Sequence, residues 1–167
     1  MPDLQIPWNQ KTLSFSKIAG PLAEQDRQCA WELYLYMSTT VAVRGQVDEH
    51  GEDHFRGEVL ADGFSHLEAF HECARGIMAR FPMGEASDYP ENLAFFTAEF
   101  LESVVRPMLL KWRAEYEFWW DENKSNGSPF VLQSNYPRLD EMLGDWIALR
   151  RFCRETMTAL ARAYEFR

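Results

Sequence analysis

Four long stretches of this chain carry apolar residues at steps of three and four, and this spacing limits the folds open to it. The clearest covers residues 59–81, and the others run over about 21–43, 92–121 and 138–164. Such spacing places the apolar side chains on one face of an α-helix, which must be buried against another element. The sequence therefore predicts an all-α fold, an antiparallel bundle of four main helices in a single domain over residues 1–167.

The segments around these helices carry turn residues and capping residues. Residues 1–20 contain two prolines and a closing glycine, and they predict an irregular N-terminal arm, with Pro21 opening the first helix. Asn92 is a candidate N-cap of the third helix, and Asp62 or Ser65 of the second. The β-branched run "TTVAV" at the end of the first helix leaves a strand open there. The acidic, glycine-containing stretch "RGQVDEHGEDHFRGE" predicts a loop, as does "NKSNGSPFVLQSNYP" before the last helix.

The third stretch includes "VVRPMLLKWRAEYEFWWDE", which has a proline inside a helical pattern and three of the six tryptophans of the chain. Pro107 cannot donate a backbone hydrogen bond, and its ring clashes with the carbonyl four residues earlier. We therefore expect this third helix to kink at Pro107, with the bend near Ser103.

Four large aromatic residues, Trp112, Tyr116, Trp119 and Trp120, fall on one side of this helix. They can simply fill the core, or some of them can reach an interface, where tryptophan and tyrosine act as anchors. Adjacent helix positions point about 100° apart, so Trp119 and Trp120 cannot both enter one narrow seam. Trp120 continues the core line, and Trp119 is therefore expected to be partly exposed and covered by a second copy or a partner.

Acidic residues and histidine offer a rival, catalytic interpretation. Glu68-x-x-His71 is half of a di-iron helix motif, and Glu99-x-x-Glu102 resembles half of the Mg²⁺ site of all-helical nucleotide pyrophosphatases. In that alternative, Glu68, His71, Glu99 and Glu102 are metal ligands of a metal-dependent hydrolase. The simpler interpretation is a solvated charged face, with Glu102 and Arg106 as a surface ion pair, and no metal or other cofactor.

Charge and cysteine usage narrow the class of protein further. The net charge is −9 and the isoelectric point is about 4.9, and an acidic field repels nucleic-acid phosphates despite the cluster of Arg150, Arg151 and Arg154. The three scattered cysteines, Cys29, Cys73 and Cys153, fit small buried apolar residues in a reducing compartment. No signal peptide or membrane span is visible, so a cytoplasmic location is expected.

The order of segments resembles a family of small bacterial helical proteins found near anti-phage defence genes. The resemblance is carried by "WELYLYMSTTVAVRG", "HLEAFHECARGIM", "VVRPMLLKWRAEYEFWW" and an arginine-rich last helix. A histidine often follows the tryptophan of the third element in that family, and here Arg113 stands in its place. The resemblance implies an accessory or regulatory component without catalysis. The expectation is a non-enzymatic protein–protein interaction module, a subunit of a larger cytoplasmic assembly in bacterial antiviral defence, with a protein partner or further copies of itself.

Overall fold

The amphipathic periodicity is realised as helices, and the structure is mostly helical, as predicted. The computed structural model describes residues 3–9, 11–15, 18, 24–81 and 92–166. Its helices are α1 (Glu24–Thr39), α2 (Val41–Arg44), α3 (Leu60–Ala79), α4 (Leu93–Phe100), α5 (Arg106–Asn123), α6 (Pro129–Ser134) and α7 (Leu139–Ala163), with a π-helical segment, Leu101–Val105, between α4 and α5.

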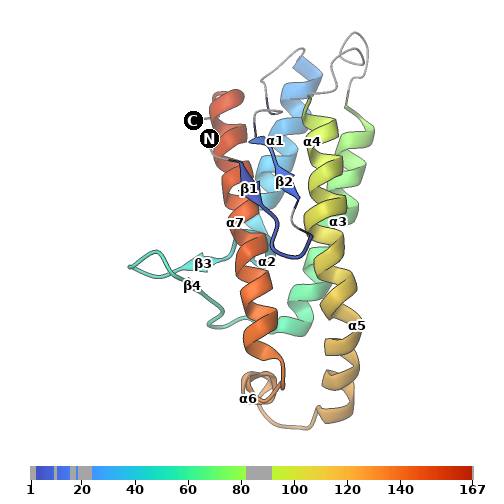
Figure 1. Cartoon of the computed structure of the whole chain (residues 1–167), viewed down its shortest axis with the longest axis vertical. Helices are drawn as coiled ribbons and strands as arrows, with labels where there is room; N and C mark the ends of the chain where they lie inside the picture. The colour runs from blue at the N-terminus through green and yellow to red at the C-terminus, as the bar shows by residue number, and fades with distance from the viewer. Residues whose placement is uncertain (1–2, 10, 16–17, 19–23, 82–91, 167) are drawn as a thin grey trace.

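The long helices run along the long axis of the molecule (Figure 1). α1 packs on α3 and α7, and α5 packs on the same two helices. Aromatic side chains fill the space between them: the ring of Phe64 lies 4.7 Å from that of Trp146 and 5.6 Å from that of Tyr116. The grouping of the helices into a four-helix bundle and the kink at Pro107 stay predictions.

The first predicted helix ends at Thr39, and Thr40 separates it from the short helix α2. The Thr40 hydroxyl donates to the carbonyl of Tyr36 at 2.8 Å, a local bond that competes with helix continuation. The "TVAV" run is helical over Val41–Arg44, so the strand alternative is wrong. Pro21, the expected start of the first helix, lies outside the described residues.

Two short hairpins correct the predictions for the non-helical segments. β1 (Leu4–Gln5) pairs with β2 (Thr12–Leu13), so the N-terminal arm is not irregular throughout, and its Ile6 and Leu13 are buried in the core. β3 (Gln46–Val47) pairs with β4 (Asp53–His54) in the stretch predicted to be a loop. This second hairpin projects from the side of the helices (Figure 1).

The N-terminal hairpin lies against the helix at the position where Pro107 interrupts its hydrogen bonding. The Pro107 nitrogen has no hydrogen to give to the Ser103 carbonyl, four residues earlier. That carbonyl instead accepts from Trp8 Nε1 and Asn9 Nδ2, both at 3.1 Å. The helix is π-helical over Leu101–Val105, two residues before the proline. The N-terminal hairpin thus satisfies a backbone group that the helix itself leaves open.

The helix starts confirm one predicted cap and correct another. The Asn92 side chain accepts from the Phe95 N–H at 3.1 Å, as predicted for an N-cap. α3 begins at Leu60, so neither Asp62 nor Ser65 caps it. Its Leu60 N–H donates to Gln133 Oε1 at 3.1 Å, and Gln133 Nε2 donates to the Glu58 carbonyl at 2.9 Å. Gln133 belongs to α6, in a region predicted to be a loop.

Candidate functional site

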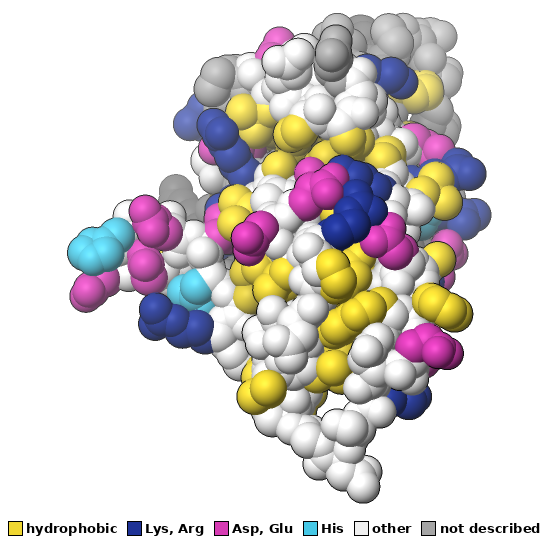
Figure 2. Space-filling view, turned by 60° about the horizontal axis from the view of Figure 1, so that its bottom comes forward, with side chains coloured by type: hydrophobic (Ala, Val, Ile, Leu, Met, Phe, Trp, Pro, Cys, Tyr) yellow, Lys and Arg dark blue, Asp and Glu magenta, His cyan; other side chains and the backbone are white. Residues whose placement is uncertain are grey.

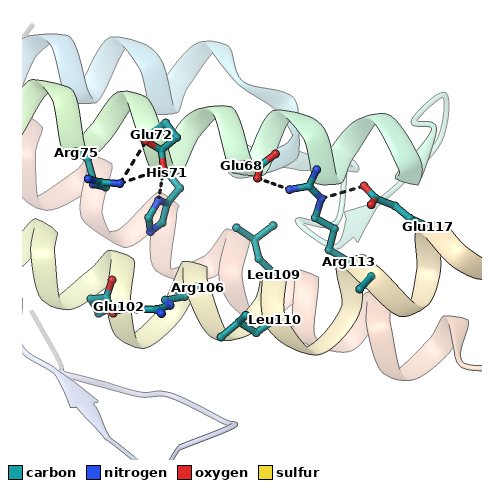
Figure 3. Close-up of a pocket in the computed structure, with 11 residues that line it drawn as sticks. Glu68, His71, Glu72, Arg75, Glu102, Arg106, Leu109, Leu110, Arg113 and Glu117 are labelled. Carbon is teal, nitrogen blue, oxygen red and sulfur yellow. Dashed lines mark hydrogen bonds and ion pairs between the residues drawn. The ribbon is translucent and has the colours of Figure 1, made fainter.

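A groove of about 620 Å³ runs between α3 and the α5 side of the molecule. α3 contributes residues spaced by three and four positions, so they share one helix face (Figure 3). The groove is lined by Glu68, His71, Glu72, Arg75, Glu102, Arg106, Leu109, Leu110, Arg113, Ala114 and Glu117. Its lining therefore combines a few apolar side chains of α5 with charges of both signs.

Arginine side chains form ion pairs with the carboxylates of this groove. Arg113 forms an ion pair with Glu68 across the groove, and its Nε donates to Glu117 at 2.9 Å. These hydrogen bonds raise the pKa of Arg113 above its usual value, with the bond to Glu68 as the largest cause. Arg106 pairs with Glu102 at 2.7 Å, as predicted for these two residues. The groove thus carries a set of internal ion pairs.

His71 is the least exposed titratable side chain in the groove, and its imidazole points from α3 toward the α5 side (Figure 3). Its side chain is 15% exposed, and Nδ1 lies 3.5 Å from Glu72 Oε1. Nε2 is buried and has no hydrogen-bond partner among the residues that the structure describes. One ring nitrogen thus faces the helix interface.

The predicted metal ligands come together only in part. Glu68, His71 and Glu102 line the same groove, whereas Glu99 does not line it. Among the described residues, no group of three or more His, Cys, Asp or Glu side chains is placed to hold a metal ion. The carboxylates of the last helix, Glu141 and Asp145, bind Lys111 at 3.2 and 2.8 Å. The hydrolase alternative stays a prediction that this geometry does not favour.

The aromatic stripe of α5 extends from the core to the surface. Trp112 and Tyr116 are fully buried, so in this structure they belong to the core and offer no surface to a partner. Trp112 donates from Nε1 to Asp145 at 2.8 Å, and its ring is flanked by the cations of Lys111 and Arg138. Burial raises the pKa of the Tyr116 hydroxyl.

Trp119 and Trp120 are both half-buried at the C-terminal end of α5. Trp119 packs against Tyr136 with ring centroids 5.1 Å apart, and Trp120 lies 6.1 Å from Tyr116. Partial exposure was expected mainly for Trp119, whereas Trp120 was expected to continue the core line. The structure leaves both side chains partly exposed.

The short helix α6 adds exposed apolar side chains at the same end of the molecule as the end of α5 (Figure 1). Phe130 is 46% exposed and Val131 is 65% exposed. Together with Trp119 and Trp120 they form a surface that we call the tryptophan end. Figure 2, in which this end comes forward, shows hydrophobic side chains exposed on this face. The sequence does not single out Phe130 and Val131, because the glycine and prolines of their segment predict a loop.

The arginines of α7 do not form a basic surface patch. Arg150 is fully buried, where it pairs with Glu58 and lies over the Phe55 ring with its Cζ 4.1 Å from the centroid. Arg154 holds the Asp53 carboxylate through two bonds of 2.9 and 2.6 Å. Two of the three arginines considered for nucleic-acid binding are therefore used inside the molecule, where they fix the β3–β4 hairpin to α7.

Comparison with known proteins gives no significant match to this chain among family models, curated proteins or solved structures. Within the described ranges, no helix is both long and apolar enough to cross a membrane.

Proposed function

We propose that this chain is a non-enzymatic protein–protein interaction module, an accessory or regulatory subunit that binds another protein through its tryptophan end. The observation that supports this proposal is the exposure of large apolar side chains there: Phe130 and Val131 on α6, which packs on α5, and the half-buried Trp119 and Trp120 at the end of α5. Exposed apolar side chains gathered at one end of a molecule are typical of sites that bind other proteins.

The two tryptophans are suited to act as anchors because the core already holds them in place. Trp119 contacts both Tyr116 and Tyr136, whose ring centroids lie 5.9 and 5.1 Å away. A ring fixed in this way loses little conformational entropy on binding, so more of its buried area contributes to affinity. Tyr136 is itself held by a 2.7 Å hydrogen bond to Glu115.

The test uses the tagged chain expressed in its native host. A protein that co-purifies at fixed stoichiometry is identified by mass spectrometry, and its affinity is then measured with purified components. Trp119→Ala should weaken binding about 30-fold or more, since truncating an anchor typically costs about 2 kcal/mol. Trp31→Ala, on α1 and also partly exposed, is the matched control and should leave the affinity unchanged.

Stability measurements on the same variants decide whether the surface is an interface. Trp119→Ala and Trp120→Ala should each keep most of the melting temperature, because both rings are only half-buried. If both variants lose most of their stability and neither affects association, the rings are ordinary core residues and the proposal fails at this surface.

The resemblance to proteins encoded near defence genes supports placing the assembly in bacterial anti-phage defence. Deleting the gene should then increase plaque formation by at least one phage, and a complementing copy with Trp119→Ala should not restore protection.

Elemental analysis of the purified protein tests the alternative function, a metal-dependent hydrolase. Stoichiometric bound metal that is lost in Glu99→Ala or His71→Ala would favour the enzyme over the interaction module.

A further inference from the structure

The outer face of α5 carries a second exposed apolar surface, separate from the tryptophan end. Leu110 is 73% exposed and Phe118 is 70% exposed, and Ala114 lies between them. These three positions follow one another at steps of four, so they form a slightly inclined stripe along the helix, which we call the α5 stripe. The stripe lies on the side of α5 opposite to the buried Trp112 and Tyr116.

We propose that the α5 stripe binds the α5 stripe of a second copy of this chain, with the two helices antiparallel and a two-fold axis at Ala114. This arrangement goes beyond the proposed function, because it concerns another surface and another partner. The axis brings Leu110 of one copy against Phe118 of the other, twice. The alanine at the crossing point allows the two helix backbones to approach closely, so the large side chains on either side can interlock.

The charges beside the stripe fit this register. In an antiparallel pair, a residue lying before Ala114 faces a residue lying about as far after it in the other copy. Arg106, eight positions before, comes opposite Asp121, seven positions after. Both side chains are exposed, and each would share or exchange its partner within the chain, Glu102 for Arg106 and Lys124 for Asp121, to form this contact.

Closer to the axis, each flank of the stripe also presents opposite charges to its copy. Arg113 and Glu117 lie on the flank toward α3, since both line the groove there. Lys111 and Glu115 lie on the opposite flank, toward α7. There Lys111 binds Asp145 of α7, and Glu115 binds Arg138. The two-fold axis places Arg113 near Glu117 of the second copy, and Lys111 near Glu115. Arg113 and Glu115 lie one position from the axis, so each also comes near its own symmetry mate, with Glu117 or Lys111 beside it as the opposite charge.

The charge balance of this helix favours a second copy over a strongly charged partner. The whole chain carries a net charge of −9, so two copies repel one another over most of their surface. Between Arg106 and Glu122, however, three basic and four acidic side chains nearly cancel. The basic residues precede Ala114 and the acidic ones follow it, so an antiparallel pair sets the basic half of each helix against the acidic half of the other. Such a face is self-complementary, which is the requirement for a two-fold interface.

The first experiment measures the mass of the full-length protein in solution over a range of concentrations, by sedimentation velocity or by light scattering after gel filtration. We expect a concentration-dependent dimer. Leu110→Ser and Phe118→Ser should each weaken it about a hundredfold, because each substitution removes an apolar contact twice. Val131→Ser, which removes an equally exposed apolar side chain from α6, should leave the dimer unchanged.

The second experiment tests the antiparallel register. Arg106→Asp alone places two acidic side chains opposite each other, twice per dimer, and Asp121→Arg alone does the same with basic side chains. Each variant should therefore be largely monomeric. An equimolar mixture of the two should form heterodimers, because every facing pair then has opposite signs. Thermal melts of each variant serve as folding controls, since both residues are exposed.

Several results would overturn the proposal. They are a monomer at every concentration, a dimer that survives both serine substitutions, and a mixture of charge variants that stays monomeric. A monomeric chain that still captures a partner through Trp119 would overturn this inference and leave the proposed function standing. A dimer that depends on Leu110 and Phe118 but captures no other protein would have the reverse effect.

Discussion

At the scale of single residues, Arg150 is a charged side chain that folding removes from water. It is fully buried, and its guanidinium donates to Glu58 and to the carbonyls of Ala42 and His54, the latter two at 3.4 Å. A buried charge is stable only when its partners replace the lost hydration. Periodicity predicted α7 but placed its arginines on the surface, because the partners of Arg150 lie about a hundred residues earlier and leave no local signal.

The Arg150–Glu58 pair yields a prediction about stability. Arg150→Met should lower the free energy of unfolding by about 3–5 kcal/mol, since it leaves the Glu58 carboxylate buried without a counter-charge. The double variant Arg150→Met/Glu58→Met should recover most of this loss, because both charges are then removed. Urea unfolding followed by circular dichroism measures both values. Arg151→Ala, an exposed neighbour, is the control and should change stability by less than about 0.5 kcal/mol.

Two neighbouring tyrosines differ in hydrogen bonding, and this difference yields a second prediction. The Tyr116 hydroxyl is buried with no partner among the described residues, whereas the Tyr136 hydroxyl donates to Glu115 at 2.7 Å. Tyr116→Phe removes a desolvated group that gains nothing in return, so it should be neutral or stabilising. Tyr136→Phe should cost about 1–3 kcal/mol, because Glu115 loses a charge-assisted bond. A Tyr116→Phe variant much less stable than the wild type would contradict this account.

Tyr116 also makes the stability of the protein depend on pH. Burial raises the pKa of Tyr116 in the folded state, so at alkaline pH the unfolded chain releases this proton first. The contribution of Tyr116 to the free energy of unfolding is therefore fully present below the pKa of about 10 that a tyrosine has in the unfolded chain. This contribution decreases as the pH rises above that value. The slope of unfolding free energy against pH above that value should be shallower in Tyr116→Phe than in the wild type.

At the scale of elements, apolar spacing predicted the helices well and short-range patterns predicted the rest poorly. The stretch 59–81 became α3, Leu60–Ala79, because a twenty-residue amphipathic face averages out single exceptions. The sequence did not predict the two hairpins, because strands of two residues are too short to show an alternation of apolar and polar residues. The groove was predicted only in pieces: the spacing of Glu102 and Arg106 predicted their ion pair, whereas Arg113, the partner of Glu68, lies far from it in the sequence and left no local signal.

The junction of the N-terminal hairpin with the Pro107 helix yields an element-scale prediction. Trp8→Phe combined with Asn9→Ala removes both donors to the buried Ser103 carbonyl and should cost about 1–3 kcal/mol. Pro107→Ala supplies a backbone N–H four residues after Ser103, so in that background the same double substitution should cost clearly less. Chemical unfolding of the four proteins gives the coupling energy. Equal costs in both backgrounds would show that the two features act independently.

At the scale of the whole molecule, one contact between α3 and α7 depends on a residue with no side chain. A Cβ atom added at Gly63 would lie 2.8 Å from Trp146 Cη2, closer than van der Waals contact allows. Trp146 cannot easily move away, because it is fully buried and its Nε1 donates to the Ala42 carbonyl at 2.8 Å. One indole thus spaces α3 from α7 and ties α7 to α2, which makes the contact a centre of the whole helix assembly.

Gly63→Ala therefore sets a gain in helix propensity against a steric clash. Replacing glycine by alanine inside a helix gains about 1 kcal/mol, whereas forcing a methyl group into a filled core costs about 1–3 kcal/mol. Because the indole is held on both sides, we expect the clash to dominate and the melting temperature to fall. Gly76→Ala on the same helix is the matched control, since no atom lies within 4 Å of its added Cβ. That variant should gain up to about 1 kcal/mol, so the two substitutions should shift the melting temperature in opposite directions. If Gly63→Ala is as stable as Gly76→Ala, α3 and α7 are free to separate by the width of a methyl group, and Trp146 does not set their spacing.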